Sequence, residues 1–299
     1  MKYKEISMLH DTLNIFKQGY YYKDNRRIEL KLSKQEQHNA KVFLPNDVNS
    51  FKDYKLTEHV HALGRCSYSC ENIDSFSLAR KRYTDFSYML NKKNPKEILV
   101  LNFANPVHPG GGVRRGSLAQ EEDLCRKSSL LLSLESKEAE KYYEYNAKLH
   151  TYMGSDAIII TPKVEIIKDE NGELLDETVV VAVMTCAAPM INYGYEGMSE
   201  EQYQNMFYNR IVGMLRCAAV MGYKNLVLGA FGCGAFGNDA KTVSDLFYRA
   251  LKEFELDGMK EKDLFQRIDF AVLSRSKSQY NFKEFYRNFG ENNFFQRRI

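Results

Sequence analysis

The chain has 299 residues, 44% of them hydrophobic, which is enough to build a full core within one large α/β domain. Lysine and arginine total 42 against 39 acidic residues, so the net charge of +3 gives no strong field for capturing DNA or a membrane, and we expect neither as a partner. The apolar runs are far shorter than the roughly 20 residues of a membrane span, and the charged start MKYKEISMLHDTL lacks the apolar stretch of a signal peptide, so we expect a cytoplasmic protein.

The cysteines and histidines predict neither a metal site nor a cofactor. The six cysteines are scattered, and only Cys66 and Cys70 form a close pair, which is too little for a zinc site. The six histidines form no H-x-x-x-H or H-E-x-x-H pattern. We therefore expect reduced, mostly structural thiols.

The first sixty residues are interpreted as an accessory region packed on the main domain. TLNIFKQG has a short helical pattern, and YYYKDNRRIELKL contains two strand-like pieces around Asp24 and Asn25. From Gly64 onward strands alternate with helices, which is typical of a layered α/β domain. The expected division is an accessory region over residues 1–60 and a main domain over residues 61–299.

The main domain begins with a strand, a helix and a second strand, over RCSYSCEN, DSFSLARKRYTDFSYMLN and EILVLNFAN. The nearly continuous apolar run of EILVLNFAN favours burial on both faces. A glycine-rich loop, HPGGGVRRGSLAQ, follows directly, and EEDLCRKSSLLLSL then resumes a helical pattern with two acids in its first turn.

The second half predicts a mixed sheet. The segment from Asp156 to Pro189 contains short strands separated by Pro162 and by an Asn171-Gly172 turn signal, which favours antiparallel pairing. SEEQ is a capping box that starts a long helix ending at Gly222. The strand NLVLGA, the glycine-rich loop FGCGAFGNDA and the helix KTVSDLFYRALKEFEL come next, before a last strand, IDFAVLS, and a closing helix, NFKEFYRNF.

The two glycine-rich loops each follow a buried strand and precede a helix. Such loops meet at the carboxyl edge of an open α/β sheet, where ligands usually bind. Glycine lets the backbone approach a ligand, and successive N–H groups at a helix start bind phosphate without lysine. Neither loop matches the P-loop or the dinucleotide-binding pattern, which disfavours those two ligand classes.

NFANPVHPGGGVRRGSLAQEE, followed by GAFGCGAFGND, resembles the bacterial-type poly(ADP-ribose) glycohydrolases, a branch of the macrodomain fold. The similarity continues through LCRKSSLL, TPKVEIIKDENGELLD and CAAP and covers nearly the whole chain. The resemblance implies a three-layer α/β/α macrodomain-like fold with a mixed sheet. It also implies hydrolysis of the ribose–ribose O-glycosidic bonds of poly(ADP-ribose) from the chain terminus, with ADP-ribose as the product.

The resemblance also implies roles for residues of both loops. Glu122 would be the catalytic acid, and Glu121 would hold the ribose on the scissile side while its charge favours a protonated Glu122. Asn105 would bind ribose hydroxyls, with a strand-end cap as its structural alternative. The other expected ADP-ribose-binding residues are backbone or loop-shaping positions, namely Gly110, Gly111, Gly112, Gln120, Gly232, Cys233, Gly234, Ala235, Phe236 and Gly237.

Three alternatives stay open at this point. His108 and Cys233 could form a Cys/His nucleophile pair if the fold brought them together. The chain could be a non-catalytic ADP-ribose reader, although such a protein would not need the two glutamates. It could also be a related hydrolase that removes mono-ADP-ribose from proteins or opens O-acetyl-ADP-ribose. Expected partners are therefore poly(ADP-ribose) or ADP-ribosylated proteins.

Overall fold

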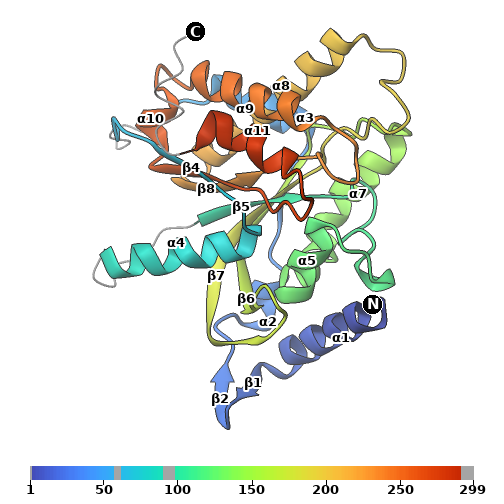
Figure 1. The fold of residues 1–299 in the computed structure, drawn as a ribbon, viewed down its shortest axis with the longest axis vertical. Coiled ribbons are helices and arrows are strands. Elements are labelled where there is room, and N and C mark those ends of the chain that lie inside the picture. Colours follow the sequence, from blue (N-terminus) through green and yellow to red (C-terminus); the bar gives the residue numbers. More distant parts are fainter. Residues whose placement is uncertain (1, 57–61, 90–97, 291–299) are drawn as a thin grey trace.

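A computed structural model describes residues 2–56, 62–89 and 98–290, and a seven-stranded sheet forms its centre (Figure 1). The strands, in sheet order, are β3 (Lys41–Phe43), β6 (Ile158–Lys168), β7 (Leu174–Cys186), β5 (Ile98–Phe103), β8 (Asn225–Gly229), β9 (Arg267–Ala271) and β4 (Ser67–Glu71). β3, β6 and β7 pair antiparallel, whereas β7, β5, β8, β9 and β4 run parallel. The sheet is mixed, as predicted.

Helices cover both faces of this sheet and form a layer on each side (Figure 1). One face packs against α3 (Pro45–Ser50), α8 (Glu200–Val220), α9 (Ala240–Lys252) and α11 (Tyr280–Phe289). The other packs against α4 (Ser75–Met89), α5 (Gln120–Lys127), α6 (Leu130–Leu134) and α7 (Lys137–Leu149). Along β5, Leu99 and Leu101 belong to the first core and Ile98 and Val100 to the second, because successive side chains of a strand point to opposite faces. The three-layer α/β/α architecture is confirmed.

The N-terminal region starts with helix α1 (Lys2–Gln18), which is longer than predicted, and the hairpin β1 (Tyr20–Lys23) and β2 (Arg26–Glu29). Asp24 and Asn25 turn this hairpin with φ of 48° and 62°, a conformation that these two residue types tolerate. α2 (Lys34–Gln37) follows, and β3 then joins the main sheet beside β6. The predicted domain boundary at residue 60 lies outside the described residues.

Two details of the predicted elements are wrong. Pro162 does not separate two short strands, because β6 runs through it with a shift of register between Thr161 and Val164 that accommodates the missing N–H. The helix expected over residues 121–134 is divided into α5 and α6. Ser128 is extended, with φ of −152°, and Ser129 exchanges hydrogen bonds with the backbone of Glu165 in β6. Side-chain and strand contacts therefore override the local helical pattern.

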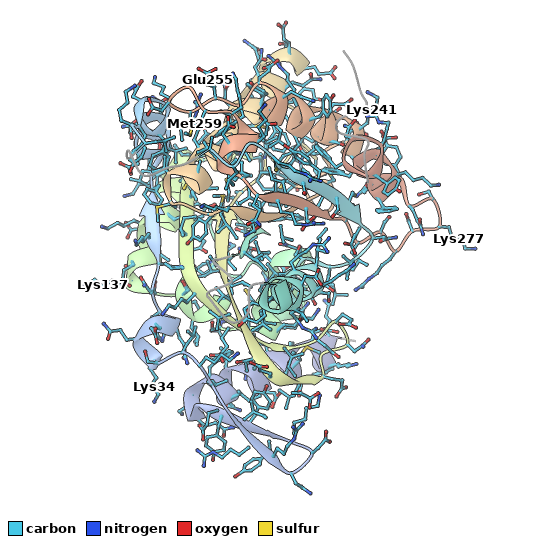
Figure 2. The ribbon with its side chains drawn as sticks, turned by 90° about the vertical axis from the view of Figure 1, so that its left-hand side faces the viewer. Lys34, Lys137, Lys241, Glu255, Met259 and Lys277 are labelled. Carbon is cyan, nitrogen blue, oxygen red and sulfur yellow. The ribbon has the colours of Figure 1, made fainter. Side chains whose placement is uncertain are left out.

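Charged side chains are spread over the outside of the molecule. Figure 2 shows the labelled lysines on well-separated parts of the surface, with Lys34 on α2, Lys137 on α7, Lys241 on α9 and Lys277 before α11. The net charge of +3 gives a polyanionic partner little long-range attraction, so local contacts have to recognise it. Within the described residues, no helix combines the length and apolar character needed to cross a membrane.

The buried carboxylate of Glu165 fastens the N-terminal region to the sheet. Its side chain is fully buried, and its two oxygens accept the N–H groups of Lys31 at 2.7 Å and Leu32 at 3.0 Å. Both donors stand at the entrance to α2, so Glu165 holds the chain between the hairpin and β3 against β6.

The Glu165→Ala variant should lose about 2 kcal/mol of unfolding free energy, because the buried N–H of Leu32 and the partly buried N–H of Lys31 both lose their acceptor. The matched control is Glu177→Ala on the neighbouring strand β7, whose exposed carboxylate pairs with the Lys31 ammonium. That variant should lose less than about 1 kcal/mol. Denaturant titration measures both, and equal losses would contradict the anchoring role.

Candidate active site

The two glycine-rich loops meet at the carboxyl edge of the sheet, because β5 and β8 are parallel neighbours. The first loop leads from β5 into α5, and the second leads from β8 into α9. With residues 73–75 and part of α1, they surround a cleft of about 740 Å³. This volume is typical of a small-molecule site, and its position is the one that the sequence predicts.

Glu121 lies in the first turn of α5 and is 2% exposed. Its Oε2 accepts the N–H of Asn105 at 2.8 Å, and its Oε1 accepts the side-chain amide of Asn102 at 3.2 Å. Burial raises the pKa of the Glu121 carboxyl to about 8, against the effect of these hydrogen bonds and helped by the charge of Glu122. Glu121 can therefore hold a proton near neutral pH.

Glu122 is held by only one of its two carboxyl oxygens. Its Oε1 accepts the N–H of Gly112 at 2.8 Å. Its Oε2 is buried and has no hydrogen-bond partner among the residues that the structure describes. Buried polar atoms are normally paired, and Glu122 lines the cleft, so its free oxygen is available to a ligand.

The three glycines of the first loop have different reasons to be glycine. At Gly111, with φ of +57°, a Cβ would lie 2.6 Å from the Glu122 Oε1 and 3.0 Å from the Glu121 Oε2. At Gly110 a Cβ would lie 2.6 Å from the Leu131 side chain, in the core, and at Gly112 it would collide with Ser117. Gly112 lines the cleft, Gly111 gives the two carboxyls their room, and Gly110 serves packing.

Asn105 and Gln120 both shape the first loop. The Asn105 Oδ1 accepts the N–H groups of Val107 and His108, each at 2.9 Å, so this side chain caps the strand end. Its Nδ2 has no protein partner within the described ranges, and the residue lines the cleft, so its amide donors remain for a ligand. The Gln120 amide is fully engaged, because it accepts from the Phe103 N–H and donates to the Leu101 carbonyl and the Ser75 hydroxyl.

The second loop contributes four of its six predicted residues to the cleft, namely Gly232, Gly234, Ala235 and Phe236. Phe236 is partly buried against the core below α8 and α9 while it also faces the cleft. Gly237, with φ of +79°, lies against Asn192, so its lack of a side chain serves loop packing. Cys233 does not line the cleft; its thiol contacts the Phe231 carbonyl at 3.7 Å.

The fold supports neither the Cys/His nucleophile pair nor a metal site within the described residues. Burial raises the pKa of the Cys233 thiol, which disfavours the thiolate, and no contact joins it to His108 among the described residues. No group of three or more metal-ligating side chains occurs within residues 2–56, 62–89 and 98–290.

Comparison with known families and structures identifies the chain. A profile described as "Microbial-type PARG, catalytic domain" matches residues 10–169. The chain belongs to this family. Its fold is similar to that of Thermomonospora curvata poly(ADP-ribose) glycohydrolase bound to the inhibitor ADP-HPD, with a TM-score of 0.81 and 26% identity over 96% of this chain and 100% of the other. The Deinococcus radiodurans enzyme in complex with ADP-ribose is 29% identical over 87% of this chain and 98% of the other, with a TM-score of 0.72.

A comparison with curated proteins found no match. Family and fold together confirm the resemblance, the α/β/α fold class and the enzyme class, poly(ADP-ribose) glycohydrolase. The roles of individual residues stay predictions.

The sequence patterns did not identify Asn102, a residue of β5 whose side chain contacts the Glu121 carboxyl. Its Nδ2 donates to Glu121 and, at 3.2 Å, to the Thr185 hydroxyl, while its Oδ1 is buried without a hydrogen-bond partner in the described structure. An asparagine inside the apolar run LVLNF is itself a signal, because a buried amide in a central strand needs a polar neighbour. In this glycohydrolase that neighbour is the carboxyl group of Glu121.

The Gly111→Ala variant should lose activity on poly(ADP-ribose) by at least about 10²-fold, because its Cβ would displace both carboxyls. Gly222→Ala is the matched control, since Gly222 also has a positive φ, +80°, but no atom lies within 4 Å of a Cβ there. Each variant meets a backbone penalty of about 1 kcal/mol, and Gly111→Ala should melt at the lower temperature because it also displaces buried carboxyls, so both are assayed well below their melting temperatures. Retention of activity by Gly111→Ala would show that the carboxyls do not depend on this gap.

The raised pKa of Glu121 also predicts a pH dependence of stability. Between about 4.5, the ordinary value, and about 8, the folded protein keeps a proton that the unfolded chain releases, so stability falls as the pH rises through this window. Glu121→Gln cannot titrate, and Asn102 can turn its amide to accept from the new donor. Denaturation at several pH values should show the wild type losing stability relative to this variant as the pH rises. Parallel pH profiles would contradict the raised pKa.

Proposed function

We propose that this poly(ADP-ribose) glycohydrolase cleaves the ribose–ribose bond at the end of the polymer and releases ADP-ribose. The observation that carries the proposal is the convergence of two buried carboxyls, Glu121 and Glu122, on Gly111 at the junction of two glycine-rich loops. The related Thermomonospora enzyme is bound to the inhibitor ADP-HPD, and the related Deinococcus enzyme is in complex with ADP-ribose. The glycine-rich loop backbones would hold its diphosphate.

The pair of glutamates favours a one-acid mechanism. Glycosidases that use two carboxylates place them on opposite sides of the sugar, about 5 Å or more apart. Glu121 and Glu122 are adjacent on one helix turn and approach the same point beside Gly111, so they cannot enclose a ribose ring. We assign Glu122 to proton transfer and Glu121 to holding the ribose.

In this mechanism the Glu122 Oε2 donates its proton to the departing 2′ oxygen as positive charge develops at the anomeric carbon. Oε1 is already occupied by the Gly112 N–H, so the unpartnered Oε2 is the atom free to hold that proton. The resulting carboxylate then takes a proton from the attacking water, which restores the acid.

The other predicted residues are assigned roles from their positions in the same cleft. Asn105 would donate its free amide hydrogens to ribose hydroxyls, and Phe236 would pack against the distal ribose. Gln120 would act by shaping the loop. We also propose ADP-ribosylated proteins as partners and the cytoplasm as the location.

The Glu122→Gln variant should release ADP-ribose from purified polymer at least about 10²-fold more slowly, because general acid–base catalysis typically contributes 10²–10⁴-fold. Glutamine keeps the acceptor for Gly112 but cannot supply a proton. Glu138→Gln, an exposed glutamate in the first turn of α7, is the control and should retain wild-type turnover.

Identification of the products distinguishes a hydrolase of poly(ADP-ribose) from a hydrolase that removes mono-ADP-ribose from proteins. Free ADP-ribose from polymer, and none from wild type on a mono-ADP-ribosylated protein, supports the proposed reaction. Turnover of only the mono-modified protein would replace it with the alternative hydrolase. A Glu122→Gln variant that retains more than about a tenth of wild-type turnover would remove Glu122 from proton transfer.

A further inference from the structure

The cleft that contains Glu122 continues past the glycine-rich loops to the N-terminal helix. Lys4, Glu5 and Met8 of α1 line it together with Arg115, Ser117 and Leu118 of the first loop. Neither α1 nor the segment 113–118 is needed for the two-loop site described above. The cleft therefore has a second compartment, bounded by α1, beside the catalytic one.

Buried contacts fix this compartment in place. Arg126 is 2% exposed; its guanidinium lies 3.2 Å from the Glu5 carboxylate and donates to the Ser117 carbonyl at 2.6 Å. At Gly116, with φ of +73°, a Cβ would lie 2.9 Å from the Lys2 carbonyl oxygen, so the loop and the start of α1 are in direct backbone contact. α1 is thus a fixed boundary of the cleft.

Two cations in this compartment have no acidic partner. Lys4 and Arg115 are exposed and make no ion pair within the described part of the chain. Their neighbours are paired: Arg114 with Glu135, Arg126 with Glu5, and Lys127 with Asp123. With Arg275, which also lines the cleft and makes no ion pair in the described part of the chain, the cleft has three unpaired cations, which favour an anionic ligand.

The first loop connects Arg115 to the catalytic carboxyl. The Arg115 N–H donates to the Gly112 carbonyl at 2.9 Å, and the Gly112 N–H holds the Glu122 Oε1. One hydrogen-bonded turn therefore connects Arg115 to Gly112, which holds Glu122, the proposed proton donor. The oxygen that leaves belongs to the next unit of the polymer, so that unit must lie close to this part of the cleft.

We propose that Lys4 and Arg115 bind the diphosphate of the ADP-ribose unit next to the one being released. The inference rests on the proposed function and names its substrate preference. Every unit of the polymer carries a diphosphate, so a second diphosphate lies next to the unit being released. A single ADP-ribosyl group on a protein has no neighbouring unit and therefore no second diphosphate. With a net charge of only +3 and dispersed lysines, the chain has to recognise the polymer through such local contacts. The N-terminal helix thereby selects polymer over single ADP-ribosyl groups.

The experiment measures ADP-ribose release from purified polymer at several salt concentrations. The double variant Lys4→Ala/Arg115→Ala should raise KM about tenfold, the effect expected for two exposed charge contacts, and change kcat little. The slope of log(kcat/KM) against log salt should become shallower by roughly 1.4, since each lost phosphate contact contributes about 0.7 on a single-stranded polyanion. A purely structural defect would not change the salt slope in this way.

Matched variants separate charge from shape. Arg114→Ala removes the adjacent cation, which is paired with Glu135 and lies outside the cleft, and should keep the wild-type KM and salt slope. The charge-conserving variant Lys4→Arg/Arg115→Lys should recover most of the lost affinity.

Each contrary outcome has a separate meaning. If the wild type releases no ADP-ribose from polymer, the proposed function fails and the inference fails with it. If the wild type is active and the double variant keeps its KM and salt slope, only the inference fails. An equal loss of affinity for free ADP-ribose, measured by calorimetry, would place the two cations on the released unit and also overturn it.

Discussion

The candidate active site of this molecule depends on two buried carboxyls at the start of one helix, each held by a backbone N–H group. Glu121 accepts the N–H of Asn105, and Glu122 accepts the N–H of Gly112, so the beginning and the middle of the first loop are fastened to α5 through acids. Burying carboxyls without cations raises their pKa, as the value of about 8 at Glu121 illustrates. The same arrangement therefore fixes the loop to α5 and favours the protonated form of Glu121 beside the proposed proton donor.

The parallel pairing of β5 with β8 brings the second loop to this centre. Ala188, at the end of β7, contacts the second loop at Gly232, where a Cβ would lie 2.6 Å from the alanine side chain. Three neighbouring strand ends thus meet around the cleft, and the small residues there leave room for a ligand. The buried cores on both faces of the sheet keep these strand ends fixed relative to one another.

Much of this arrangement could be predicted from sequence because periodicity and turn chemistry are local. The apolar run of β5, the Asn171-Gly172 turn and the capping box at Ser199 each specify their element without help from the rest of the chain. Pro162 and Ser128 were interpreted wrongly because their structure depends on strand partners distant in sequence. The sequence pattern does not predict α7, whose tyrosines Tyr142 and Tyr143 are buried in the core.

The same distinction applies within the candidate site. Glycine patterns located the loops, yet sequence could not separate Gly110 and Gly237, which serve packing, from Gly112 and Gly234, which line the cleft. It also could not connect Lys4 to Arg115, since more than a hundred residues separate them and their elements meet through tertiary contacts, namely Glu5–Arg126–Ser117 and Gly116 against Lys2. An N-terminal helix with no chemistry of its own thus becomes part of a binding cleft through one buried arginine. The proposed effect on substrate choice depends on the position of α1. A substitution of Arg126 that releases α1 should therefore also reduce the preference for polymer.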